Sequence, residues 1–166
     1  FDLKTIAMSA WIPYLGADFG SLIGGFASAF FIRRGMSVVS ARKLAMCCFA
    51  VLMPVAIPAV RAESPITALF FITIATTAHQ AWAASLLTLP ADLFPRRSVA
   101  SAYGFTGMCG MLGSALFSPL VGYMVDHFHS YVPVFTIVGF LHPVAAIIVV
   151  LFVRSKASRP KEPVTA

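Results

Sequence analysis

The chain has 166 residues, of which 59% are hydrophobic and 11% are charged, and its mean hydropathy is +0.88. A water-soluble domain carries about 25% charged residues, so the composition excludes an ordinary soluble fold. The net charge of +6 would suggest nucleic acid as a partner. Here, however, the basic residues form short clusters between apolar blocks, which excludes that partner.

Five apolar blocks follow one another along the chain, and each is long enough to cross about 30 Å of hydrocarbon as a helix. Membrane strands are shorter and alternate apolar with polar residues. We therefore predict an all-α membrane protein, with a transmembrane bundle over residues 1–153 and a disordered cytoplasmic tail over 154–166. The predicted spans are residues 6–32, 44–60, 66–94, 99–125 and 131–153.

The basic residues predict the orientation in the membrane. Ten of the 12 lie in the loop 33–43, in the loop 95–98 or after the last block, and Lys4 and Arg61 lie on the other side. The positive-inside rule places both loops and the C-terminus in the cytoplasm. The chain begins at Phe1 rather than Met, and we expect a truncation that has removed earlier helices.

The third block carries polar residues near its middle. A polar side chain at this depth faces a packed interface or a water-filled cavity, and secondary transporters bind their substrates there. Thr76 and Gln80 are one helical turn apart, and His79 and Trp82 are also neighbours on the helix surface. We predict that these four residues contact a substrate. The alternative is that His79 and Gln80 only form hydrogen bonds to adjacent helices.

Asp18 is the acidic residue that lies well inside the first block. A carboxyl group in this position could bind a proton, or it could accept hydrogen bonds in helix packing. Tyr14, one turn earlier, is a further predicted substrate contact.

Small residues recur in the fourth block, where glycines occupy positions 104, 107, 110 and 113. Such spacing favours close helix packing. The same face could instead leave room for a ligand, and Thr106 is the hydroxyl residue beside it. Thr106 therefore completes the predicted substrate contacts.

Charged residues at the ends of the blocks suggest a gate. Asp92 and Arg96 have the spacing of one helical turn and could form a pair. Arg33 and Arg34 are expected on the same side of the membrane. We predict an ion network here that holds the cytoplasmic helix ends together in one state and releases them in another.

Enzyme chemistry finds no support, because the chain lacks the GxSxG, HExxH and GxxxxGK[ST] motifs. We expect no cofactor. The cysteines at positions 47, 48 and 109 lie in apolar blocks without metal-site spacing. His127 and His129 have no evident third ligand, so we expect no metal and interpret them as loop residues.

Three segments of this chain carry a family resemblance. The run His79-Gln80-Ala81-Trp82 and residues 92–101, Asp-Leu-Phe-Pro-Arg-Arg-Ser-Val-Ala-Ser, resemble the tenth helix and following loop of hexuronate transporters. These belong to the anion:cation symporter family of the major facilitator superfamily. Residues 11–20, with Gly24-Gly25 and Arg33-Arg34-Gly35, resemble the eighth helix of that family. Residues 107–123 resemble the eleventh.

The resemblance implies a fold of twelve helices in two six-helix bundles, of which this chain would supply helices eight to twelve. It implies proton-coupled uptake of sugar acids such as glucuronate or galacturonate across the bacterial inner membrane by alternating access. The tenth helix lines the cavity in this family, which favours His79, Gln80 and Trp82 as contacts. The missing N-terminal helices would supply a basic residue for the substrate carboxylate and the usual proton-coupling acid.

One departure concerns residues 26–30, which carry no acid where many facilitators have one. Two other functions remain open. The substrate could be another organic anion, such as an aldonate or a dicarboxylate. The chain could also be a non-transporting membrane remnant or an assembly partner.

Overall fold

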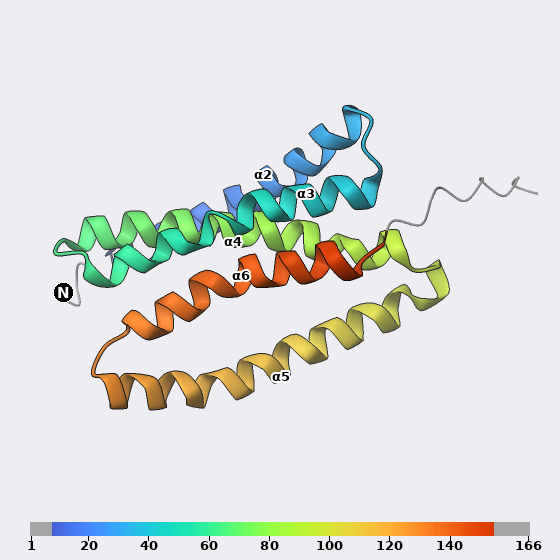
Figure 1. Cartoon of the computed structure of the whole chain (residues 1–166). Helices are drawn as coiled ribbons and strands as arrows, with labels where there is room; N and C mark the ends of the chain where they lie inside the picture. The colour runs from blue at the N-terminus through green and yellow to red at the C-terminus, as the bar shows by residue number, and fades with distance from the viewer. Residues whose placement is uncertain (1–7, 155–166) are drawn as a thin grey trace, which may run out of the picture.

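The computed structural model describes residues 8–154, and these form long helices without strands (Figure 1). The predicted all-α fold is confirmed. The elements in chain order are α2 (Ile12–Arg33), α3 (Val38–Ala50), the 3₁₀ segment η1 (Met53–Arg61), α4 (Pro65–Leu93), α5 (Arg96–Phe128) and α6 (Val132–Phe152). Lys4 and the predicted disordered tail from residue 155 onward lie outside the described residues.

Four stretches are long and apolar enough to cross a membrane, namely Ile12–Arg33, Val38–Arg61, Arg96–Phe128 and Val132–Phe152. They correspond to the predicted first, second, fourth and fifth spans. Helix α4 has 29 residues and is not among these four stretches; it carries His79, Gln80 and several threonines. A helix inside a bundle can carry such residues, since they face protein rather than lipid. The span at 66–94 stays a prediction.

Local sequence explains where the helices begin. Pro65 opens α4, and Pro13 and Pro133 lie in the first turns of α2 and α6. Proline suits a first turn because the N–H that it lacks would have no partner there. The Ser37 side chain caps α3. Gly35, with φ of +93°, makes the turn from α2 to α3 in a conformation that favours glycine.

The second span is not one continuous α-helix. It begins at Val38, earlier than the predicted residue 44, and changes from α to 3₁₀ geometry at Met53. Pro54 and Pro58 lie in the 3₁₀ part, where they remove two backbone donors of the α pattern. Membrane helices tolerate such breaks when neighbouring helices satisfy the freed groups.

Helices α2 and α4 pack with their backbones in close contact. The buried face of α2 consists of small residues spaced by four, Gly20, Gly24 and Ser28. The facing pairs are Gly20 with Thr77, Gly24 with Ala81 and Ser28 with Ser85. Because both members of each pair advance together along the chain, α2 and α4 run parallel, as expected for spans separated by one antiparallel segment.

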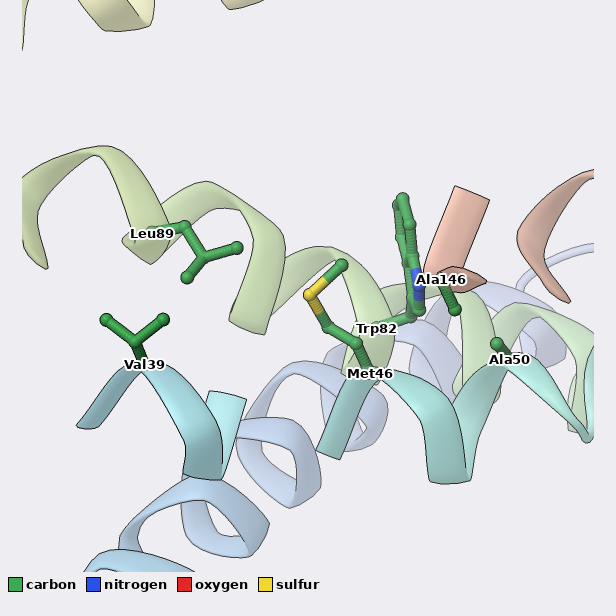
Figure 2. Packing of buried hydrophobic residues seen from close by; sticks show 6 residues of the cluster. All are labelled: Val39, Met46, Ala50, Trp82, Leu89 and Ala146. Atoms are coloured by element: carbon green, nitrogen blue, oxygen red, sulfur yellow. The ribbon is translucent and has the colours of Figure 1, made fainter. Parts of the chain in front are cut away.

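A hydrophobic core joins α3, α4 and α6 (Figure 2). Its buried members are Val39, Met46, Ala50, Trp82, Leu89 and Ala146. Near one end of this core, the Lys43 ammonium donates a hydrogen bond of 3.1 Å to the carbonyl oxygen of Val150. The core and this bond hold α6 against α3 and α4. They therefore set the positions of the α4 and α6 side chains that contact one another.

Helix α5 runs along one side of the bundle (Figure 1) and buries only Met124 among its own residues. A Cβ atom added at position 104, 107, 110 or 113 would meet nothing within 4 Å. The predicted packing through these glycines is therefore wrong for contacts among residues 8–154. The glycine spacing marks a smooth face, but no described helix covers it.

Candidate functional site

Two histidines join α4 and α6 near the middle of the bundle. Nδ1 of His79 lies 2.9 Å from Nε2 of His142, and the two rings meet edge to face with their centroids 5.0 Å apart. One of the two nitrogens carries the hydrogen and the other accepts it. The alternative considered for His79, a hydrogen bond to a neighbouring helix, is thus part of its actual environment.

Trp82 lies behind this pair. Its ring centroid is 4.9 Å from that of His142, at an interplanar angle of 78°. The indole is only 9% exposed and belongs to the hydrophobic core in Figure 2. Its Nε1 atom is buried without a hydrogen-bond partner among the described residues. Trp82 therefore contacts His142 from the core side, and its predicted role as an aromatic wall beside a substrate stays a prediction.

A pocket of about 350 Å³ opens between α4, η1 and α6. Its polar lining consists of Thr76, His79 and His142, and the rest is apolar, with Met53 and Phe135 among the larger side chains. Small-molecule sites have volumes of about 300–1,000 Å³ and combine apolar walls with a few polar groups. The pocket fits this description at the lower end.

Thr76 and Gln80 lie one turn apart on α4, as predicted. The Thr76 hydroxyl lies 3.0 Å from the carbonyl oxygen of Thr73 and 3.1 Å from that of Pro13 on α2, so its hydrogen is used within the protein. Gln80 is half-buried, and within residues 8–154 its amide makes no hydrogen bond. Gln80 can therefore offer both a donor and an acceptor to a ligand.

The structure does not bring the other predicted contacts to the histidine pair. Tyr14 is 75% exposed, and Asp18 lies exposed on the same helix without an ion pair among the described residues. Thr106 donates a hydrogen bond of 2.8 Å to the carbonyl oxygen of Ala102 in its own helix. All three lie on helix faces that no described helix covers.

The predicted pair of Asp92 and Arg96 is replaced by another. Asp92 forms its ion pair with Arg42 of α3, and both side chains are about one-fifth exposed. Helix α4 ends at Leu93 and α5 begins at Arg96, with extended backbone between them. The spacing of one helical turn, on which the predicted pair depended, therefore does not exist at this position.

The remaining gate residues lie at the same end of the bundle. The Arg34 guanidinium carbon lies 4.9 Å from the centroid of the Phe30 ring, a cation–π arrangement. Arg33 and Arg96 are exposed and form no ion pair within the part of the chain that the structure describes.

Sequence reasoning missed two residues. His142 is the ionisable residue in the apolar stretch of α6, and the rule that such residues are functional inside spans would have found it. Arg42 was interpreted only as a topology signal.

No group of three His, Cys, Asp or Glu side chains within residues 8–154 could hold a metal ion.

A chain of membrane-crossing helices with polar side chains midway along an interior helix, beside a small pocket, has the architecture of a membrane transporter. The chain belongs to the Major Facilitator Superfamily, whose sequence model matches residues 3–166. The expectation that the chain is not an enzyme agrees with this membership.

Two curated relatives agree with the family resemblance seen in the sequence. The chain is 35% identical over 157 residues to the hexuronate transporter of Escherichia coli (strain K12), a match that covers 94% of this chain and 36% of that protein. The hexuronate transporter of Escherichia coli O157:H7 matches with the same identity and coverage. The chain thus spans about a third of the length of these relatives.

Proposed function

We propose that the chain is the C-terminal part of a secondary transporter that imports a hexuronate, such as glucuronate or galacturonate, together with protons by alternating access. The observation that carries this proposal is the similarity to hexuronate transporters along 94% of the chain. The polar residues midway along α4 support it, because substrates of secondary transporters bind at this depth.

The chemistry of the site suits a sugar acid. A carboxylate accepts hydrogen bonds, and both the Gln80 amide and a ring N–H of His79 can donate them. Sugar hydroxyls can also donate to the amide oxygen of Gln80 and to the oxygen of Thr76. Tyr14 and Thr106 would contact the same substrate from the uncovered faces of α2 and α5, and Trp82 would act through His142.

The proposed orientation places loops 33–43 and 95–98 and the C-terminus in the cytoplasm of a bacterium, with the helices in its inner membrane. Because α2 and α4 run parallel, both loops lie at the same end of the bundle. The ion pair of Arg42 with Asp92 joins α3 to the end of α4 next to these loops. We include this pair, with Arg33, Arg34 and Arg96, in a gate that closes one side of the transport path.

The test is uptake of radiolabelled glucuronate by cells that express the full-length protein containing these residues, with and without a proton uncoupler. We expect uptake that the uncoupler abolishes, and a large loss of uptake in the His79→Ala and Gln80→Ala variants. His127→Ala is the control, because His127 is exposed near the end of α5. Membrane abundance is measured for every variant.

Other results would favour the other functions. Uptake of an aldonate or a dicarboxylate without hexuronate uptake would keep the transporter class and replace the substrate. No uptake of any organic anion by a well-expressed full-length protein would contradict the proposal and favour a membrane remnant or an assembly partner.

A further inference from the structure

The beginning of α3 meets the end of α6 at one end of the bundle (Figure 1). The Lys43 ammonium of α3 donates a hydrogen bond of 3.1 Å to the carbonyl oxygen of Val150. Val150 lies in the last turn of α6, which ends at Phe152, and carbonyl groups in a last turn have no partner within their own helix. Lys43 therefore closes this helix end, and the bond holds its ammonium group beside α6. Lys43 and residues 150–154 form the α3–α6 seam.

The seam carries positive charge that no acidic residue neutralises. An ammonium group has three N–H donors, and Lys43 uses one of them on Val150. Arg154 follows the end of α6 and is exposed. Asp92 is the acidic residue at this end of the described helices, and it pairs with Arg42. Lys43 and Arg154 form no ion pair among the described residues, so both can bind an anion.

Apolar side chains lead away from these two cations on both helices. On α3, Leu44, Cys48 and Val51 are exposed and about one helical turn apart, so they form a stripe. On α6, Leu151 and Ile147 form the corresponding stripe, with 66% and 59% exposure. Both helices belong to stretches that are apolar enough to cross a membrane. Cations at the helix ends and apolar stripes below them match the two parts of a phospholipid, its headgroup and its acyl chains.

We propose that the α3–α6 seam binds an anionic phospholipid, with its phosphate between Lys43 and Arg154 and its acyl chains on the apolar stripes. A phosphate diester carries one negative charge and accepts hydrogen bonds, so it suits two cations that lack an acidic partner. Basic sites between membrane helices bind anionic headgroups in this way. The inference needs only that these helices cross a membrane, and it depends neither on the transported substrate nor on the orientation.

The seam distinguishes an anionic phospholipid from two related ligands. A zwitterionic phospholipid has its own ammonium group close to the phosphate, and this group competes with Lys43 and Arg154 for the negative charge. Inorganic phosphate has the charge but no acyl chains, so it gains nothing from the apolar stripes. Each basic residue near an anionic headgroup contributes about fivefold in affinity. The bond to Val150 already holds Lys43 in place, which reduces the freedom lost on binding.

The bound lipid ties α3 to α6, because its phosphate contacts one cation from each helix. Ala146 of α6 lies one turn before Val150 and belongs to the hydrophobic core. His142 lies one further turn before Ala146 and lines the pocket. The lipid therefore stabilises the helix that supplies His142 to the pocket, and the melting temperature of the protein should rise when the lipid binds.

The experiment uses the full-length protein, purified in a neutral detergent, with phosphatidylglycerol as the anionic probe. Native mass spectrometry measures lipid binding, and thermal unfolding measures stabilisation. We expect phosphatidylglycerol to bind and to raise the melting temperature, and we expect no such effect from phosphatidylcholine or inorganic phosphate. Equal stabilisation by phosphatidylcholine would show binding without recognition of charge, and stabilisation by inorganic phosphate alone would show a site for a free anion. Either result would overturn the proposal.

Matched variants locate the lipid on the seam. Arg154→Gln should weaken phosphatidylglycerol binding about fivefold, and it leaves the bond of Lys43 to Val150 intact. Lys43→Met keeps the apolar stem and removes the charge, so it should weaken binding by at least as much. Arg97→Gln, at the start of α5, and Arg61→Gln, at the end of η1, remove the same charge elsewhere and should bind the lipid as the wild type does.

Arg154→Gln decides the test if Lys43→Met does not fold. Wild-type affinity of Arg154→Gln for phosphatidylglycerol would overturn the proposal. An equal loss of affinity in Arg97→Gln would overturn it too, because the lipid would then respond to the charge of the whole membrane surface rather than to the seam.

Discussion

Gly20 of α2 lies so close to Thr77 of α4 that a Cβ atom added to the glycine would be 2.2 Å from the carbonyl oxygen of Thr77. One turn further on, a Cβ atom at Gly24 would be 2.3 Å from the carbonyl oxygen of Ala81. Both near atoms belong to the backbone of α4, which cannot move aside as a side chain can. The two helices therefore form one rigid unit whose spacing is set by glycine.

The Gly20→Ala substitution should destabilise the protein by about 1–3 kcal/mol, the usual cost of overpacking. Gly25→Ala is the matched control, because a Cβ atom there meets nothing within 4 Å and alanine is favoured over glycine in a helix. Thermal unfolding of the detergent-solubilised full-length protein measures both. Equal melting temperatures for the two variants would show that α2 and α4 are further apart than described.

The hydroxyl groups of Ser28 and Ser85 lie 3.0 Å apart at 2% and 1% exposure. Ser28 also lies 3.1 Å from the Gly24 carbonyl, to which it donates, so it accepts from Ser85. A double-mutant cycle with Ser28→Ala and Ser85→Ala should give a coupling energy of about 0.6 kcal/mol, the average for such bonds between membrane helices. Ser21→Ala, on an exposed position of α2, should show no coupling with Ser85→Ala.

Reversal of the ion pair tests the proposed gate. Arg42→Asp and Asp92→Arg should each slow glucuronate uptake, because each leaves two like charges facing one another. The double variant restores the attraction and should recover most of the rate. The free energy of unfolding of these variants should change by only about 0–1 kcal/mol, as for other partly exposed ion pairs. Arg97→Gln, on an exposed residue at the start of α5, is the control, and a double variant as slow as the singles would contradict the gate.

Cysteine labelling tests whether the uncovered face of α5 lines the transport path. Cys109 lies three residues after Thr106, and both are exposed, as is Cys48 on α3. A charged maleimide reacts with thiolate in water, so it should modify Cys109 and spare Cys48 in the lipid. Peptide mass spectrometry of labelled membranes measures the modified fraction of Cys109 and of Cys48. Glucuronate should slow labelling at Cys109, and faster labelling at Cys48 would contradict this arrangement.

The sequence predicts the helices well because hydropathy acts on each segment alone. Apolar length is enough to identify α2, α5 and α6, and the prolines explain two of their starts. The second span was found, but its change to 3₁₀ geometry was not. That change depends on how Pro54 and Pro58 pack against α6, where a Cβ atom at Gly139 would lie 3.3 Å from the Cα atom of Pro54.

Partners were harder to predict than elements. The glycine spacing of α5 suggested packing, yet it is the face of Gly20 and Gly24 on α2 that packs. The glycine spacing indicates a helix face without large side chains. Whether another helix packs on that face depends on where that helix lies in the fold. Asp92 was assigned a partner by helical spacing, which failed because the helix ends at Leu93. The sequence predicted His79 as a site residue but not its contact with His142. The two residues are 63 positions apart in the chain, and a pattern within one helix cannot predict a contact over that separation.

The 3₁₀ segment η1 gives the second span two parts of unequal stiffness. Nine residues cover about 18 Å in 3₁₀ geometry, compared with about 13.5 Å in an α-helix, and the two prolines reduce the backbone bonds that resist bending. Met53 and Ala56 of this softer part form one wall of the pocket beside His79 and His142. Bending at the junction with α3 would therefore change the width of that pocket, while the α4–α6 contact through His79 and His142 would stay in place.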